Sequence, residues 1–125
     1  MADPAESDQV MAFEVEPDGL IRLSWGHGVR ITGELARAAM ARVDEINGRT
    51  ENPLLVSMTG TAELSRDARV VFTRRCSASR IALVGRSAVD RVIANFALGV
   101  SSVPVPTRFF TSEPAAVGWL RRTAR

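Results

Sequence analysis

Residues 53–76 read PLLVSMTGTAELSRDARVVFTRRC, and this stretch decides the fold. Residues 54–56 form a short apolar run after a proline, which is typical of a buried central strand. A polar loop follows, and Ser65 stands where its side chain can cap a helix that continues to Arg75. A strand, a loop and a capped helix in this order predict one unit of an α/β domain with a parallel sheet.

The residues before this stretch predict a hairpin and a first helix. Apolar residues alternate in 13–15 and 20–25, on either side of the turn sequence Pro17-Asp18-Gly19, which indicates two antiparallel strands. From Thr32 the apolar spacing changes to three and four residues, and Gly48 stands at the end of that pattern. These features predict a helix that Thr32 caps and Gly48 terminates.

The residues after this stretch repeat the alternation of strand and helix. Residues 81–84 and 108–110 indicate two further strands, Ser87 to Gly99 a third helix, and Ser112 to Arg122 a last helix that contains Pro114 near its start. The predicted order is ββαβαβαβα. It implies an α/β fold with a mixed, mostly parallel five-stranded sheet and four helices, in which the first strand is antiparallel at an edge.

Length and composition predict one soluble domain. The chain has 125 residues, of which 46% are hydrophobic and 24% charged, as in ordinary globular domains. We interpret residues 1–9 as a flexible acidic tail and 10–125 as a single domain. No apolar run is long enough for a membrane span, the N-terminus lacks the pattern of a signal peptide, and the single cysteine fits a reducing cytoplasm. All 16 basic residues are Arg, which suggests a GC-rich bacterial genome.

The element order resembles a known fold. The segment LLVSMTG at residues 54–60 is similar to the strand that ends in Asp-Leu-Ser-Gly in the SpoIIAA-like fold, the STAS superfamily of anti-sigma-factor antagonists. The resemblance covers residues 13–122, including the last strand and the helix that follows it. The chain looks like an uncharacterised small bacterial branch of that superfamily.

The resemblance also places a phosphorylation motif. In phosphoregulated members an Asp-Ser-Ser-Gly sequence at a helix cap carries the serine that accepts phosphate, and Ser65-Arg66-Asp67-Ala68 aligns with it here. Asp67 thus stands at the acceptor position and Ser57 replaces the strand-end Asp, so the motif is degenerate. Ser65 remains a candidate acceptor. The structural alternative is that Ser65 is an N-cap and Asp67 a partner of the helix dipole.

We therefore expect a non-catalytic regulatory or protein-interaction module that forms homodimers in the cytoplasm. Its expected contact surface is the loop and helix start after the central strand. The predicted partner-binding residues are Ser57, Thr59, Gly60, Thr61, Ser65 and Asp67.

A second hypothesis is a small-molecule or lipid-binding module that uses the apolar, irregular segment 96–110. Here Arg108 would anchor an anion. The residues that would line a ligand groove or a dimer contact are Phe96, Val103, Val105 and Arg108, although ordinary packing beneath the last helix explains the same pattern.

The remaining signals for chemistry are weak. His27 and Cys76 are the only residues of their kinds, so we expect no enzyme, no metal site and no cofactor, because catalytic and metal sites need clusters of such groups. Seven arginines between residues 66 and 91 indicate either a basic face for carboxylates or phosphates, or a solvated helix surface. No aromatic pattern accompanies them, and we therefore expect no binding of nucleic acid. The seven are Arg66, Arg69, Arg74, Arg75, Arg80, Arg86 and Arg91.

Overall fold

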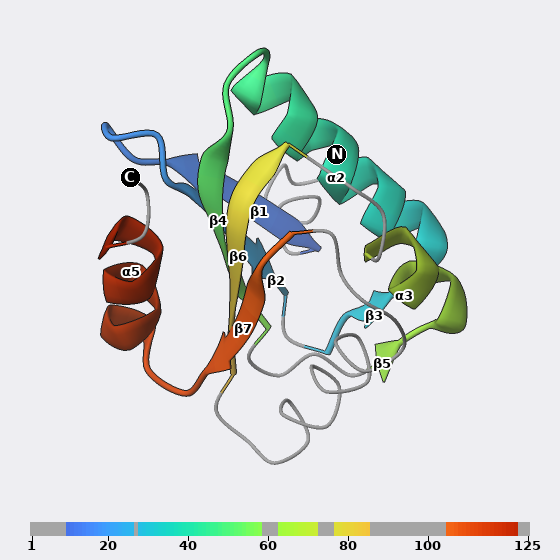
Figure 1. The fold of residues 1–125 in the computed structure, drawn as a ribbon. Coiled ribbons are helices and arrows are strands. Elements are labelled where there is room, and N and C mark those ends of the chain that lie inside the picture. The colour runs from blue at the N-terminus through green and yellow to red at the C-terminus, as the bar shows by residue number, and fades with distance from the viewer. Residues whose placement is uncertain (1–9, 27, 59–62, 73–76, 86–104, 123–125) are drawn as a thin grey trace, which may run out of the picture.

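Five strands form one sheet in the computed structural model, which describes residues 10–26, 28–58, 63–72, 77–85 and 105–122. β1 is antiparallel to β2 at one edge, and the other neighbours are parallel. The predicted mixed, mostly parallel sheet with an antiparallel edge strand is therefore confirmed (Figure 1). In spatial order the strands are β1 (Met11–Val15), β2 (Ile21–Trp25), β4 (Asn52–Ser57), β6 (Ala78–Val84) and β7 (Thr107–Phe110).

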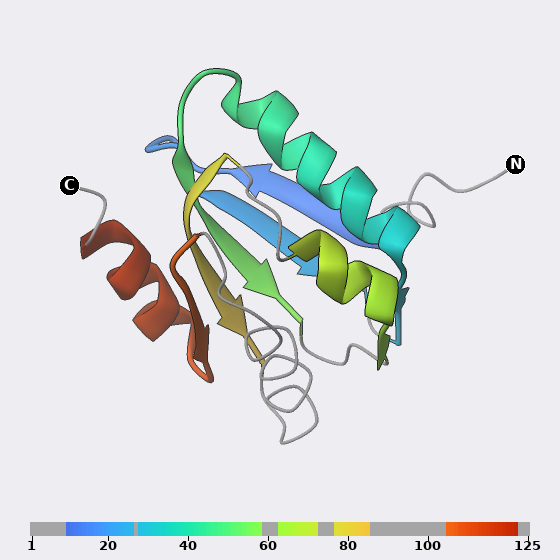
Figure 2. The ribbon, with the colours of Figure 1, turned by 45° about the vertical axis from the view of Figure 1, so that its right-hand side comes forward.

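Helices cover both faces of the sheet. α2 (Gly33–Asn47) and α3 (Arg66–Phe72) lie on one face, and α5 (Glu113–Arg122) lies on the other (Figures 1 and 2). These helices confirm three of the predicted four. The predicted helix from Ser87 to Gly99 lies outside the described residues.

Each face of the sheet has its own apolar core, because alternate side chains of a strand point to opposite faces. Ile21 and Leu23 pack with α2 and α3 on one face. Leu55 and Ala82 pack with Leu120 of α5 on the other. Complete burial of a leucine or isoleucine side chain contributes about 1.5–3 kcal/mol, so both layers stabilise the fold.

The helix cap, the glycine at the end of the helix and the turn glycine that the sequence predicts are all present in the structure. The Thr32 Oγ1 accepts a hydrogen bond of 3.2 Å from the Leu35 amide at the start of α2. Gly48 follows α2 with a φ of 58° and donates its amide to the Asp44 carbonyl. In the hairpin, Gly19 has a φ of 96°, a backbone conformation that favours glycine.

A second, two-stranded sheet was not predicted. β3 (Arg30–Ile31) pairs in parallel with β5 (Glu63–Leu64), and the Ser65 amide donates to the Ile31 carbonyl at 3.0 Å. This ribbon fixes the segment before α3 against the segment before α2. The starts of the two helices are thereby held side by side.

A buried asparagine joins the end of α2 to the sheet. Asn47 is 4% exposed, and its Nδ2 donates to the Ser77 Oγ at 2.9 Å and to the Ser77 carbonyl. Its Oδ1 accepts from the Asn52 Nδ2 at 2.9 Å. Both polar ends of this buried amide are satisfied, as stability requires, so we assign Asn47 a structural role.

Candidate functional site

The start of α3 is held by Ser65. Its Oγ accepts a hydrogen bond of 3.1 Å from the Ala68 amide, which is the geometry of a helix N-cap. The Ser65 backbone amide donates a hydrogen bond to the Ile31 carbonyl of β3. The interpretation of Ser65 as an N-cap is therefore confirmed.

Asp67 is exposed in the first turn of α3 and packs beside the first residue of α2. A Cβ built on Gly33 would lie 2.7 Å from the Asp67 Cβ, closer than real Cβ atoms approach. Glycine at position 33 thus permits the two helix starts to meet. In this position the positive end of the α3 dipole stabilises the negative charge of the Asp67 carboxylate.

The outer side of α3 carries two charged side chains and one apolar one. Arg66 and Asp67 are exposed, and Val70, one turn later, is 48% exposed. We call these three residues the α3 surface. A half-exposed apolar side chain with a charged rim is the usual anatomy of a protein contact.

The structure separates the predicted partner-binding residues. Ser57, at the end of β4, shares the sheet face of Leu55, which packs in the α5 layer, whereas Ser65 and Asp67 belong to the α3 layer. Alternation along β4 directs Ser57 to the sheet face opposite the layer that holds Asp67. Thr59, Gly60 and Thr61 lie outside the described residues.

The structure also divides the predicted basic face. Arg66 is exposed on α3, whereas the Arg80 guanidinium lies over the Trp119 ring of α5, across the sheet. These two arginines cannot share a surface. Arg74, Arg75, Arg86 and Arg91 lie outside the described residues, and so do His27 and Cys76.

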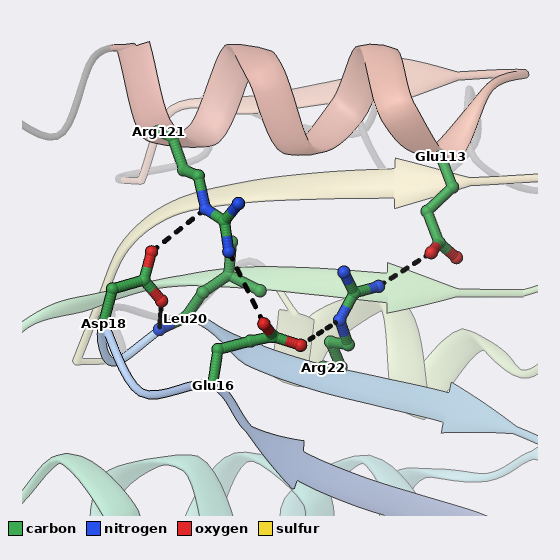
Figure 3. Close-up of polar contacts among 6 residues, drawn as sticks. All are labelled: Glu16, Asp18, Leu20, Arg22, Glu113 and Arg121. Carbon is green, nitrogen blue, oxygen red and sulfur yellow. Dashed lines mark hydrogen bonds and ion pairs between the residues drawn. The ribbon is translucent and has the colours of Figure 1, made fainter.

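On the β2 side of α5, ion pairs connect the helix to the hairpin (Figure 3). Arg22 contacts Glu16 and Glu113, each at 2.8 Å. Arg121 contacts Asp18 at 3.0 Å and Glu16 at 3.5 Å. These five residues, which we call the β2-side network, hold both ends of α5 against the hairpin.

The network keeps Arg22 charged. The hydrogen bond that Arg22 donates to Glu16 is the main cause that raises the pKa of its guanidinium above the ordinary value, and burial opposes this. A raised pKa in the folded state means that the pairing stabilises the fold below the ordinary arginine pKa, as long as the partner carboxylates are ionised. At the alkaline end the contribution is lost as the pH rises through the raised value.

On the β7 side of α5, arginines contact aromatic rings instead of carboxylates. The Arg80 Cζ lies 4.6 Å from the centroid of the Trp119 ring, and the Arg108 Cζ lies 5.5 Å from that of Phe110. The two ring centroids are 5.6 Å apart. We call these four residues the arginine–aromatic ladder.

The ladder includes two residues of the predicted ligand segment 96–110, Arg108 and Phe110. Arg108 is exposed at the edge of the sheet, as an anion anchor would be. Val105 is only 5% exposed, so its side chain is packed inside the domain. Phe96 and Val103 lie outside the described residues.

Sequence reasoning missed three members of the ladder. The sequence places Arg80 among the seven arginines of a basic face or a solvated helix surface, and it indicates no contact for Phe110 or Trp119. One signal was present: residues 80, 82 and 84 alternate with residues 81 and 83 along a strand, which places Arg80 on the side of the final helix once the layers are known.

The described ranges show no group of three His, Cys, Asp or Glu side chains that could hold a metal ion. No helix within these ranges has both the length and the apolar character needed to span a membrane.

Comparison with known proteins gives a family and a fold. Residues 13–124 match the family model described as "Domain of unknown function (DUF7793)". An uncharacterised protein of the DUF3478 family from Shewanella loihica PV-4, whose crystal structure has a SpoIIAA-like fold, is 20% identical, with a TM-score of 0.57 over 88% of this chain and 91% of that one. This similarity confirms the predicted SpoIIAA-like fold.

A protein with unknown function from Arthrobacter sp. FB24, which has a crystal structure, is 52% identical in sequence to this chain. It covers 90% of this chain and 100% of that one, with a TM-score of 0.37. No protein of curated function matches.

Proposed function

Because the chain belongs to the family "Domain of unknown function (DUF7793)" and has a SpoIIAA-like fold, we propose that it is a non-catalytic regulatory module that binds another protein. The α3 surface is its docking site. The observation that carries this proposal is the exposed Asp67 beside Val70, on a helix start fixed by the Ser65 cap and the close packing at Gly33.

The proposed docking does not depend on phosphorylation. Asp67 bears a permanent charge of about one unit, whereas a phosphoserine bears nearly two. The helix start is already ordered by the Ser65 cap and by the β3–β5 ribbon. A partner can therefore recognise the charged, ordered helix start without a kinase.

The proposal includes homodimers in the cytoplasm. Val15, on the edge strand β1, is 53% exposed and offers an apolar contact for a second copy. Light scattering of the purified chain should give twice the monomer mass. A monomer at all accessible concentrations would remove self-association from the proposal and leave the α3 docking site standing.

Affinity capture from the native cell, with quantitative mass spectrometry, tests the docking site. Asp67→Arg and Val70→Glu should each lower recovery of one common partner by tenfold or more, since contacts at the centre of an interface contribute about 2 kcal/mol or more. Glu51→Arg is the matched control, because Glu51 is an exposed carboxylate beyond the far end of α2. If every captured protein were recovered equally with all four baits, the α3 surface would not be the docking site.

A further inference from the structure

Two arginines on the β7 side of α5 have no carboxylate partner in the described part of the chain. Arg80 and Arg108 contact Trp119 and Phe110, respectively, and neither forms an ion pair there. Arg80 is half-buried and Arg108 is exposed. Two positive charges thus lie on one side of α5, one of them partly withdrawn from water, and no carboxylate of the described ranges pairs with either.

The carboxylates that contact arginine around α5 in the described ranges are engaged on the other side of the helix. They are Glu16, Asp18 and Glu113, and all three pair with Arg22 or Arg121 on the β2 side. Because these carboxylates are already paired, they neutralise little of the positive charge of Arg80 and Arg108. The electrostatic potential at the ladder therefore stays positive.

Ring contact leaves the arginine donors available. A guanidinium over an aromatic ring uses its face, while its N–H groups lie along its edge and point away from the ring. The rings also restrict the positions of both side chains, so a ligand would order fewer rotamers on binding. A pre-positioned edge of N–H donors suits the oxygens of a phosphate group.

The backbone register brings both arginines within reach of one ligand. Arg108 pairs with Ala82 across β6 and β7, and Arg80 precedes Ala82 by two residues on the same face. From the spacing of strands and residues, their Cα atoms lie about 8 Å apart on the diagonal. Arginine side chains from two such positions can approach neighbouring phosphate oxygens.

We propose that Arg80 and Arg108 form a binding site for a phosphate group, with Trp119 and Phe110 holding the two guanidinium groups in place. A phosphate monoester carries about two negative charges, which match the two arginines. The group belongs either to a soluble phosphate ester or to a lipid headgroup. The site lies across the sheet from the α3 surface, so it is independent of the proposed protein docking.

Isothermal titration calorimetry of the full chain with pyrophosphate, at low ionic strength, tests the soluble source. We expect saturable binding that weakens by about tenfold or more in Arg80→Gln/Arg108→Gln, because each charged hydrogen bond contributes at least that factor. Arg49→Gln, at an exposed position after α2, should bind like the wild type. Asp67→Arg should also bind normally, which separates this site from the docking proposal.

Flotation with vesicles that contain phosphatidic acid, whose headgroup is a phosphate monoester, tests the lipid source, with phosphatidylcholine vesicles as the neutral control. Retention on anionic vesicles that the double glutamine variant loses would assign the site to a lipid headgroup. Arg80→Lys/Arg108→Lys keeps both charges but loses the planar fork, and it should bind between the wild type and the glutamine variant. Circular dichroism checks that each variant is folded. If the glutamine variant is unfolded, the binding measured with the lysine variant tests the proposal instead.

Two results would overturn the proposal. One is the absence of saturable binding to both pyrophosphate and anionic vesicles. The other is binding that persists with unchanged affinity when both arginines are replaced.

Discussion

The two sides of α5 use the same residue type in opposite ways. On the β2 side, Arg22 and Arg121 are paired with three carboxylates, and they fasten the helix to the hairpin. On the β7 side, Arg80 and Arg108 rest on aromatic rings and form no ion pair with a described residue. Arginines whose charge is compensated within the fold are structural, whereas those held on aromatic rings are candidates for recognition.

Removing the core contact of α5 should break both sides together. Leu120 is fully buried in the layer beneath the helix. Leu120→Ala should lower the free energy of unfolding by about 2–5 kcal/mol, because it removes buried methyl groups and leaves a cavity. Urea denaturation measures the loss.

Val70→Ala is the control for this experiment, since Val70 is half-exposed and no contact between copies of the chain is proposed there, and its cost should stay within about 0.5 kcal/mol. Equal costs for the two variants would show that α5 does not depend on its buried face.

Removing the centre of the β2-side network should have a smaller effect. Arg22→Gln takes away two ion pairs whose arginine side chain is 21% exposed. We expect a loss of about 1–2 kcal/mol, since the pairs are only partly screened by water. The melting temperature, measured at low salt and again in 1 M NaCl, should show a difference from wild type that shrinks with salt.

Arg42→Gln tests the same interaction in a fully exposed setting. Its pair with Glu45 has side chains 56% and 70% exposed, so the cost should not exceed about 0.5 kcal/mol. If this variant lost as much stability as Arg22→Gln, partial burial would not be what strengthens the network.

Removing one rung of the ladder should have the smallest effect and a different salt response. Arg80→Gln loses the contact with the Trp119 face, worth about 0.5–1 kcal/mol. The loss should change little between low salt and 1 M NaCl, because the charge and the ring are in direct contact. Thermal unfolding in the same two buffers gives the comparison, and a loss that vanished in salt would indicate an ordinary surface ion pair in its place.

Features predicted correctly depend on neighbouring residues. The caps at Thr32 and Ser65, and the glycine after α2, are local choices whose hydrogen bonds join residues three or four apart. The alternation of strands and helices then implies a parallel sheet. These relations can be read along the chain.

Features that were missed depend on distant residues. The two-residue strands β3 and β5 have no periodicity of their own, and only their mutual pairing defines them. Arg80 meets Trp119 because β6 and α5 occupy adjacent layers. Ser57 and Asp67 are ten residues apart in sequence but lie on opposite faces of the sheet, because Ser57 faces the α5 layer and Asp67 belongs to α3 in the other layer. Assembly of the layers decides all three.

The proposed phosphate site lies on the β7 side of α5, beside Trp119. The chain has two tryptophans, one in each layer: Trp119 in the ladder and Trp25, 5% exposed, in the core beneath α2. A pyrophosphate titration followed by proton–nitrogen NMR should move the Trp119 indole signal saturably and leave that of Trp25 in place. Equal shifts of both signals, or no shift of Trp119, would contradict the proposed site.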